Sequence, residues 1–119
     1  MNERKALILV SVGLMGLVLA APPKGNAKAG ETIYLQNCMG CHGAKGAGAL
    51  GPTLAGKKSD VPGRSFEVFK AAMIKGVDDA GKPLKAPMPV WGKQGFGNSG
   101  KAPTDQQIAD LQAYLKSIK

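Results

Sequence analysis

Both cysteines and the only histidine of the chain lie within five consecutive positions, Cys38-Met39-Gly40-Cys41-His42. This is the C-x-x-C-H spacing at which a c-type haem is attached. Two thiols three residues apart can each form a thioether with one vinyl group of a haem, and the next residue then places an imidazole under the iron as proximal ligand. The motif therefore predicts one covalently bound haem c, a cofactor that most often moves single electrons.

Three other interpretations of the cysteine pair fit the chain less well. A thioredoxin-like redox pair expects a βαβ context, and no strand alternation surrounds Cys38 and Cys41. A structural zinc site needs four protein ligands, whereas the chain has three Cys and His residues in all. A disulfide between two cysteines this close would close a very small loop and add little stability.

The first residues carry the pattern of a secretion leader. A short charged stretch at 2–5 precedes an apolar run of 16 residues at 6–21, and small residues suited to cleavage follow. This arrangement is typical of a signal peptide, with a cut after Ala20 or after Ala27. The apolar run is shorter than the ~18 residues of a spanning helix. We therefore expect a periplasmic protein, with an uncleaved membrane anchor that faces the periplasm as the alternative.

Residues 28–119 are expected to form one haem domain, and residues 1–27 the signal peptide and a linker. The net charge of the chain is +8, and its basic residues are spread along the sequence. Nucleic acid is not an expected partner of an exported haem protein without interleaved aromatic and basic residues. We interpret the charge as a docking surface for acidic redox-partner proteins, with a generic solubilising surface as the alternative. The candidate docking lysines are Lys45, Lys82, Lys85 and Lys93.

Capping residues and apolar periodicity predict three main helices. Ser65 is an N-cap followed by an apolar stripe. Thr104 and Gln107 have the spacing of a capping box just before a second stripe. The predicted helices run from near Asn26 or Gly30 to the cysteines, from Ser65 to Lys75, and from Thr104 to the end of the chain.

The two stretches between these helices, 43–63 and 77–103, are rich in glycine and proline and predict loops. Structureless loops of this length are unusual in a small domain unless they wrap a cofactor. The chain also has only six aromatic residues with which to build a core. We therefore expect an all-α fold with three main helices and long loops wrapped around one covalently attached haem.

Taken in order, these motifs resemble the class I (monohaem) cytochrome c family in its small bacterial form, over about residues 30–118. Gly30 and Tyr34 match the first helix of the family, and Leu111 and Tyr114 match the last helix, which crosses the first. The resemblance implies that the glycine lets the two helices approach closely while the aromatic residues lock the crossing. It also implies the cytochrome c fold and a periplasmic one-electron carrier.

Two loops resemble the ligand loops of the same family. The GPTL stretch at 51–54 resembles the loop whose proline carbonyl accepts a hydrogen bond from the ligating imidazole. This implies that Pro52 orients His42 and raises the basicity of its ring. The APMP stretch at 86–89 resembles the distal methionine loop, which implies Met88 as the second iron ligand.

Composition narrows the choice of the sixth iron ligand without the family, because His42 is the only histidine. Met39 lies in the attachment segment on the proximal side, and Met73 fits the apolar stripe of the second predicted helix. Met88 lies between two prolines, where a stiff backbone can present its side chain. We predict Met88, with Met73 or an open position as alternatives. A glycine-rich insertion at 95–100 departs from the family and leaves the geometry of this loop open.

A site with both His and Met ligands is full, so the expected reaction is outer-sphere transfer of one electron, with no catalytic residues. The alternatives are a cytochrome subunit dedicated to a dehydrogenase or oxidase, a haem enzyme or gas sensor with an open sixth position, and thiol–disulfide exchange. For Trp91 we expect either a packing role or donation of its N–H to a haem propionate.

Overall fold

The computed structural model describes residues 21–119, so most of the predicted signal peptide and linker at 1–27 lies outside the described residues. Within the described part the chain forms helices and loops, with no strand and one isolated β-bridge between Val77 and Pro83. The prediction of an all-α fold is confirmed. Among residues 21–119, no helix has the length and apolar character needed to cross a membrane.

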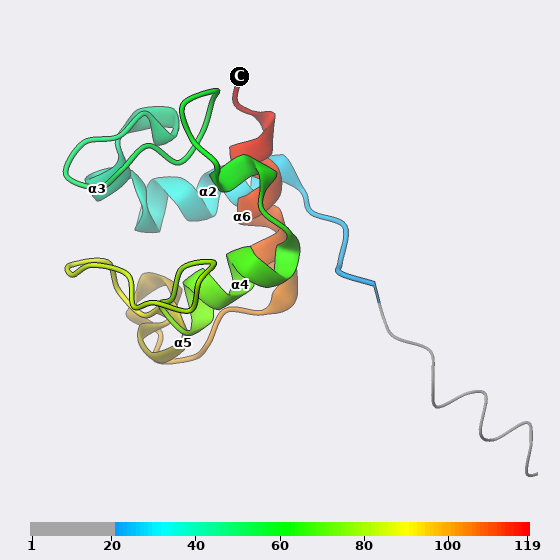
Figure 1. Cartoon of the computed structure of the whole chain (residues 1–119). Coiled ribbons are helices and arrows are strands. Elements are labelled where there is room, and N and C mark those ends of the chain that lie inside the picture. Colours follow the sequence, from blue (N-terminus) through cyan, green and yellow to red (C-terminus); the bar gives the residue numbers. More distant parts are fainter. Residues whose placement is uncertain (1–20) are drawn as a thin grey trace, which may run out of the picture.

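Three longer helices carry the fold (Figure 1), and short helical turns lie between them. The longer helices are α2 (Ala27–Asn37), α4 (Phe66–Ile74) and α6 (Asp105–Ser117). The turns are α3 (Met39–His42), α5 (Trp91–Gln94), η1 (Ala44–Gly46), η2 (Val61–Gly63) and η3 (Phe96–Asn98). The predicted number and order of main helices is therefore right.

The longer helices begin where polar side chains can cap them. Asn26 caps α2 and Ser65 caps α4. Each side chain accepts a hydrogen bond from the backbone N–H three residues later in the chain, at 3.0 and 3.2 Å. Thr104 and Gln107 form the predicted capping box, in which each side chain accepts the backbone N–H of the other residue, at 3.1 and 2.9 Å. Each cap satisfies N–H groups that a helix start leaves without a partner.

The first and last helices, α2 and α6, cross at close range and form the centre of the molecule. A Cβ on Gly30 would lie 1.9 Å from the carbonyl oxygen of Asp110, so only a glycine lets the two backbones meet. The rings of Tyr34 and Tyr114 pack beside this point, with their centroids 5.3 Å apart. Leu111 is 1% exposed in the same core. The crossing that the resemblance implied is therefore present.

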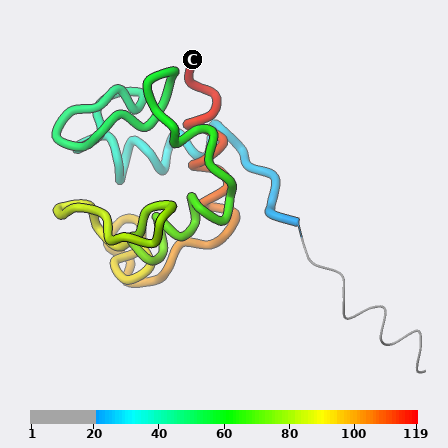
Figure 2. Tube along the Cα trace, in the orientation of Figure 1, coloured from blue at the N-terminus to red at the C-terminus, as the bar shows by residue number. Residues whose placement is uncertain are grey.

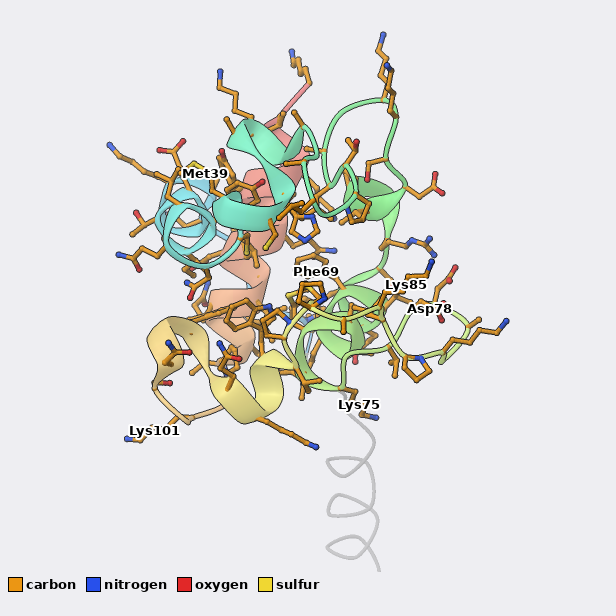
Figure 3. The ribbon with its side chains drawn as sticks, turned by 90° about the vertical axis from the view of Figure 1, so that its left-hand side faces the viewer. Met39, Phe69, Lys75, Asp78, Lys85 and Lys101 are labelled. Atoms are coloured by element: carbon orange, nitrogen blue, oxygen red, sulfur yellow. The ribbon has the colours of Figure 1, made fainter. Side chains whose placement is uncertain are left out.

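Most of the chain between α2 and α6 lies to one side of this helix pair. In the trace of Figure 2, α3 and the loop that follows it lie above, while α4, α5 and the loop between them lie below. Viewed onto this open side (Figure 3), Met39 lies on the upper part and Phe69 between the two parts. Phe69 is nevertheless 4% exposed, because core side chains surround it.

The segment before α2 is clamped onto α6. The side-chain amide of Gln106 donates to the carbonyl oxygen of Lys24, and the backbone N–H of Asn26 donates to the buried carboxylate of Asp110, both at 2.8 Å. Gly25 has no room for a side chain, since a Cβ there would lie 2.1 Å from a backbone oxygen of α6. The later of the two cleavage positions considered from the sequence would remove this clamp, whereas the earlier one leaves it whole.

The stretches at 43–63 and 77–103 were predicted as loops, and the structure corrects this locally, because both contain helical turns. The turn α5 has no capping signal in the sequence, because the residue before it is Val90, whose side chain cannot accept a hydrogen bond from the first turn. Tertiary packing holds it in place. A Cβ on Gly92 would lie 2.2 Å from the carbonyl oxygen of Ile74, so the backbone of α5 rests directly on the end of α4.

Candidate haem site

The attachment segment begins at the end of α2 and is completed by the turn α3. Cys38 is the C-cap of α2, and its amide N–H donates to the carbonyl oxygen of Tyr34 at 2.8 Å. The N–H of His42 in turn donates to the carbonyl oxygen of Cys38 at 3.0 Å. The two cysteines form no disulfide with each other, and Cys38 is buried while Cys41 is exposed. Burial raises the pKa of the Cys38 thiol to about 12, so it is protonated at neutral pH.

The imidazole of His42 is held by one of its two nitrogens. Nδ1 lies 2.8 Å from the carbonyl oxygen of Pro52, which is the contact that the resemblance implied. A carbonyl oxygen can only accept, so Nδ1 carries the proton, and the lone pair of the neutral ring is on Nε2. His42 is 6% exposed. The loop thus fixes the tautomer that can bind a metal through Nε2.

The loop that follows α3 also encloses the backbone of this segment. The N–H of Gly51 donates to the carbonyl oxygen of Cys41 at 2.7 Å, and that of Gly48 donates to the carbonyl oxygen of His42 at 2.6 Å. Gly51 lies directly against the ring, because a Cβ there would be 2.7 Å from Cε1 and 2.8 Å from Nδ1 of His42. The sequence pointed to the loop at 51–54 but not to this contact.

Two methionines pack into or against the same core. Met73 is a core residue of α4 and is 7% exposed, while Met88 is partly buried and packs against the core cluster. Met39 is 39% exposed on the surface of α3. The structure therefore brings both candidate distal ligands to the core and leaves Met39 outside it. The choice of Met88 over Met73 remains a prediction.

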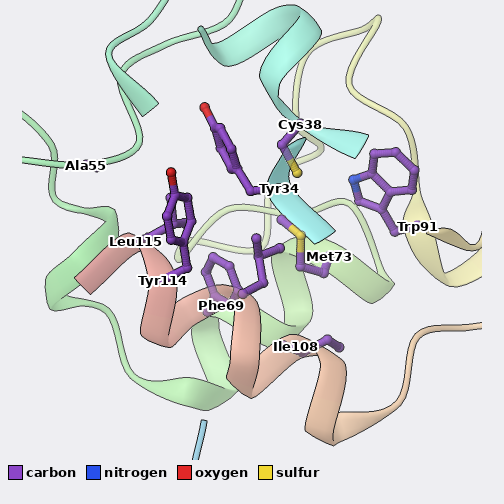
Figure 4. Close-up of a cluster of buried hydrophobic side chains, with 10 residues drawn as sticks. Tyr34, Cys38, Ala55, Phe69, Met73, Trp91, Ile108, Tyr114 and Leu115 are labelled. Carbon is purple, nitrogen blue, oxygen red and sulfur yellow. The ribbon is translucent and has the colours of Figure 1, made fainter. Parts of the chain in front are cut away.

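Side chains from three separate elements face a common region. In Figure 4 the sulfur atoms of Cys38 and Met73 and the indole nitrogen of Trp91 are turned toward one another, and all three residues belong to one buried cluster. Trp91 is 4% exposed and packs on Phe96 at 5.3 Å between ring centroids. Its Nε1 is buried and has no hydrogen-bond partner among residues 21–119.

A buried donor without an acceptor is costly, and in native structures it usually marks a partner that is not polypeptide. Together with two cysteines that form no disulfide and an oriented imidazole, the donor of Trp91 fits a large, mainly apolar prosthetic group with some polar atoms. The residues present therefore fit a haem. The packing role expected for Trp91 is observed, and donation of its N–H to a haem propionate stays a prediction.

Comparisons with known proteins agree with this geometry. Residues 27–119 match the family model described as Cytochrome c. The chain belongs to the cytochrome c family. It is 33% identical to the cytochrome c of Tetrahymena pyriformis, over 81% of this chain and 92% of that protein, and 33% identical to a cytochrome c-553-like protein of Synechocystis sp., over 80% and 71%. No solved structure matches.

A shorter match concerns a larger protein. Over 44 residues, 36% of this chain, the sequence is 46% identical to the dihydro-heme d1 dehydrogenase of Pseudomonas aeruginosa, and the match covers 9% of that protein.

As a member of its family, this cytochrome c binds one covalent haem c and carries electrons. Cys38 and Cys41, with His42, fit the attachment motif.

Gly51→Ala is expected to disturb the imidazole of His42 without changing any atom of that residue. The φ of Gly51 is not in the left-handed region, so the effect comes from the clash of the new methyl group with the His42 ring. We expect a loss of about 1–3 kcal/mol in the unfolding free energy of the holoprotein, as for overpacking in general. Denaturant unfolding measures the loss of unfolding free energy, and the visible spectrum reports the disturbance of the His42 ring.

Gly63→Ala is the matched control, because a Cβ there meets nothing within 4 Å and its φ is also ordinary. This change should alter the unfolding free energy by no more than about 0.5 kcal/mol. Equal effects of the two substitutions would contradict the packing of Gly51 on the ring.

Proposed function

We propose that this cytochrome c is a periplasmic one-electron carrier whose haem iron is ligated by His42 and Met88. The observation that carries the proposal is the 2.8 Å contact of His42 Nδ1 with the Pro52 carbonyl oxygen, which leaves Nε2 for the iron. The partial burial of Met88 against the core supports its place as the second ligand. The apolar run at 6–21 supports export.

Each residue of the site then has a chemical task. Cys38 and Cys41 hold the group covalently, Pro52 keeps His42 in one tautomer, and Met88 supplies a thioether sulfur that favours Fe(II). The haem supplies the change of oxidation state at iron. The buried apolar side chains keep water away, which disfavours the additional positive charge of Fe(III) and raises the reduction potential.

The test is an absorption spectrum and a redox titration of protein produced together with a haem-attachment system. A low-spin spectrum, a one-electron titration and no prompt binding of carbon monoxide at neutral pH are expected. Denaturing mass spectrometry should show the mass of one haem and no free thiol. Extraction of the haem into acid acetone, or prompt carbon monoxide binding, would contradict covalent attachment or a full iron site, respectively.

A second candidate function is a cytochrome subunit bound to a dehydrogenase. The partial match to the dihydro-heme d1 dehydrogenase is the observation that favours it. Size-exclusion chromatography of native extract separates the two functions. A free carrier elutes at the size of this chain alone, whereas a subunit elutes with a larger complex.

We further propose that acidic partner proteins dock on the open side of the molecule. Lys45, Lys82, Lys85 and Lys93 are exposed, and none forms an ion pair among the described residues. Lys85 lies right of centre in Figure 3, at about the height of Phe69. The positive charges of these lysines would attract an acidic surface of the partner and so raise the association rate.

The association rate with such a partner is expected to fall as salt rises, because the Debye length shortens from about 10 Å at 0.1 M to about 3 Å at 1 M. Stopped-flow mixing with the oxidised partner measures the rate. Lys85→Gln should flatten the salt dependence more than Lys101→Gln, which changes a lysine at the lower left of Figure 3. A rate that is independent of salt would exclude steering by these lysines.

A further inference from the structure

Tyr34 makes a contact that the aromatic packing of the two helices does not require. It is 0% exposed, and its ring packs on Tyr114 of α6. Its hydroxyl group donates a hydrogen bond to the carbonyl oxygen of Gly43 at 2.5 Å. Gly43 directly follows His42 in the chain. A phenylalanine would pack equally well on α6 but could not make this bond.

With this bond, one residue holds both ends of the attachment segment. The backbone carbonyl oxygen of Tyr34 accepts the N–H of Cys38 at 2.8 Å, and its side chain holds the carbonyl group of Gly43. The backbone bond is part of the ordinary helix end. The hydroxyl bond is additional, and it spans nine positions in the sequence.

The other bonds around His42 come from the loop that follows it. Gly48, Gly51 and Pro52 hold the carbonyl groups of His42 and Cys41 and the imidazole Nδ1. A loop of this kind can move together with the ligand that it holds. Tyr34 is different because it belongs to the α2–α6 pair, the most closely packed part of the fold.

The hydroxyl group of Tyr34 stays a donor over the whole neutral range. Burial raises the pKa of the phenol above its ordinary value of 10.0, against a smaller opposing effect of the Gly46 amide. The neutral form therefore persists at every pH below that value. The bond to Gly43 is not expected to switch on or off during function.

We propose that Tyr34 is a positioning residue for the iron ligand. Its hydroxyl ties the carbonyl group of Gly43, and through it the imidazole of His42, to the α2–α6 helix pair. The orientation of the ring about its bond to iron is then set by the helix crossing as well as by Pro52. This inference rests on the proposed ligation by His42 and adds a second restraint on the same ring.

The test compares Tyr34→Phe with Tyr114→Phe in the oxidised holoprotein. Both changes remove one hydroxyl group from the same ring pair, but the hydroxyl of Tyr114 has no hydrogen-bond partner among residues 21–119. The readout is the pattern of haem-methyl proton shifts, which depends on the orientation of the axial imidazole. We expect this pattern to shift or broaden in Tyr34→Phe and to stay as in the unmodified protein in Tyr114→Phe.

Amide hydrogen exchange gives a second readout. The N–H groups of Gly46 and Gly48 donate to the carbonyl oxygens of Gly43 and His42, so their exchange should accelerate in Tyr34→Phe beyond any general loss of stability. Haem-methyl shifts that are the same in both variants, with exchange raised uniformly, would overturn the proposal. Failure of His42 ligation is seen separately, since the unmodified protein would then lack a low-spin spectrum.

Discussion

Met88→Ala is expected to abolish the long-wavelength sulfur-to-iron absorption of the oxidised protein and to lower its reduction potential. On the proposed ligation, the change removes the thioether that disfavours Fe(III), and it opens the iron to water and added ligands. The fall should be on the order of 0.2 V, a fraction of the about 0.8 V range that axial ligands span. The fold should survive in weakened form, because the thioethers and His42 still hold the haem. Spectroscopy and redox titration measure both effects.

Met73→Ala is the control for this prediction, because Met73 is buried in the same core. It should leave the sulfur band intact and reduce the unfolding free energy by roughly 2–5 kcal/mol, as expected for a cavity left by a buried methionine. If Met73→Ala abolished the band while Met88→Ala kept it, the assignment of the distal ligand would be reversed.

Gly30→Ala is expected to destabilise the fold strongly. The added methyl group would lie 1.9 Å from the carbonyl oxygen of Asp110 and 2.9 Å from the backbone nitrogen of Leu111. Both are main-chain atoms, so α2 and α6 have to separate, and the Tyr34–Tyr114 pair separates with them. We expect a loss at or above the upper end of the about 1–3 kcal/mol that overpacking costs.

Thermal unfolding of the holoprotein measures this loss, with Gly63→Ala again as the control that adds a methyl group where there is space. The spectrum of folded Gly30→Ala should still show an attached haem, because the attachment segment itself is unchanged. A midpoint equal to that of Gly63→Ala would contradict the close backbone contact.

The longer helices could be predicted because their signals are local. Ser65, Thr104 and Gln107 cap helices from within three residues of the first turn, and the apolar stripes that follow are short-range patterns. The clamp before α2 could not be predicted in this way. The bond between Asn26 and Asp110 joins positions 84 apart in the sequence, and neither residue type specifies its partner.

The candidate site divides in the same manner. The C-x-x-C-H segment and the loop of Pro52 could be found because their residue types and order carry the chemistry. The contact of Gly51 with the His42 ring depends on how the loop closes, which no sequence pattern contains. Tyr34 was interpreted only as a packing residue. Its hydroxyl group was the missed signal, since a buried hydroxyl has to find an acceptor.

The fold is closed by its two ends, and this has a consequence for the order of maturation. A chain that emerges from its N-terminus presents Cys38 and Cys41 before α6 exists to complete the core. In the folded chain the two cysteine side chains are unequal, since Cys38 is 6% exposed and Cys41 is exposed. Thioether formation at Cys38 therefore requires this side chain to be more accessible than it is in the folded chain. We therefore expect haem attachment to precede the docking of α6 on α2, since α6 completes the core in which Cys38 is buried.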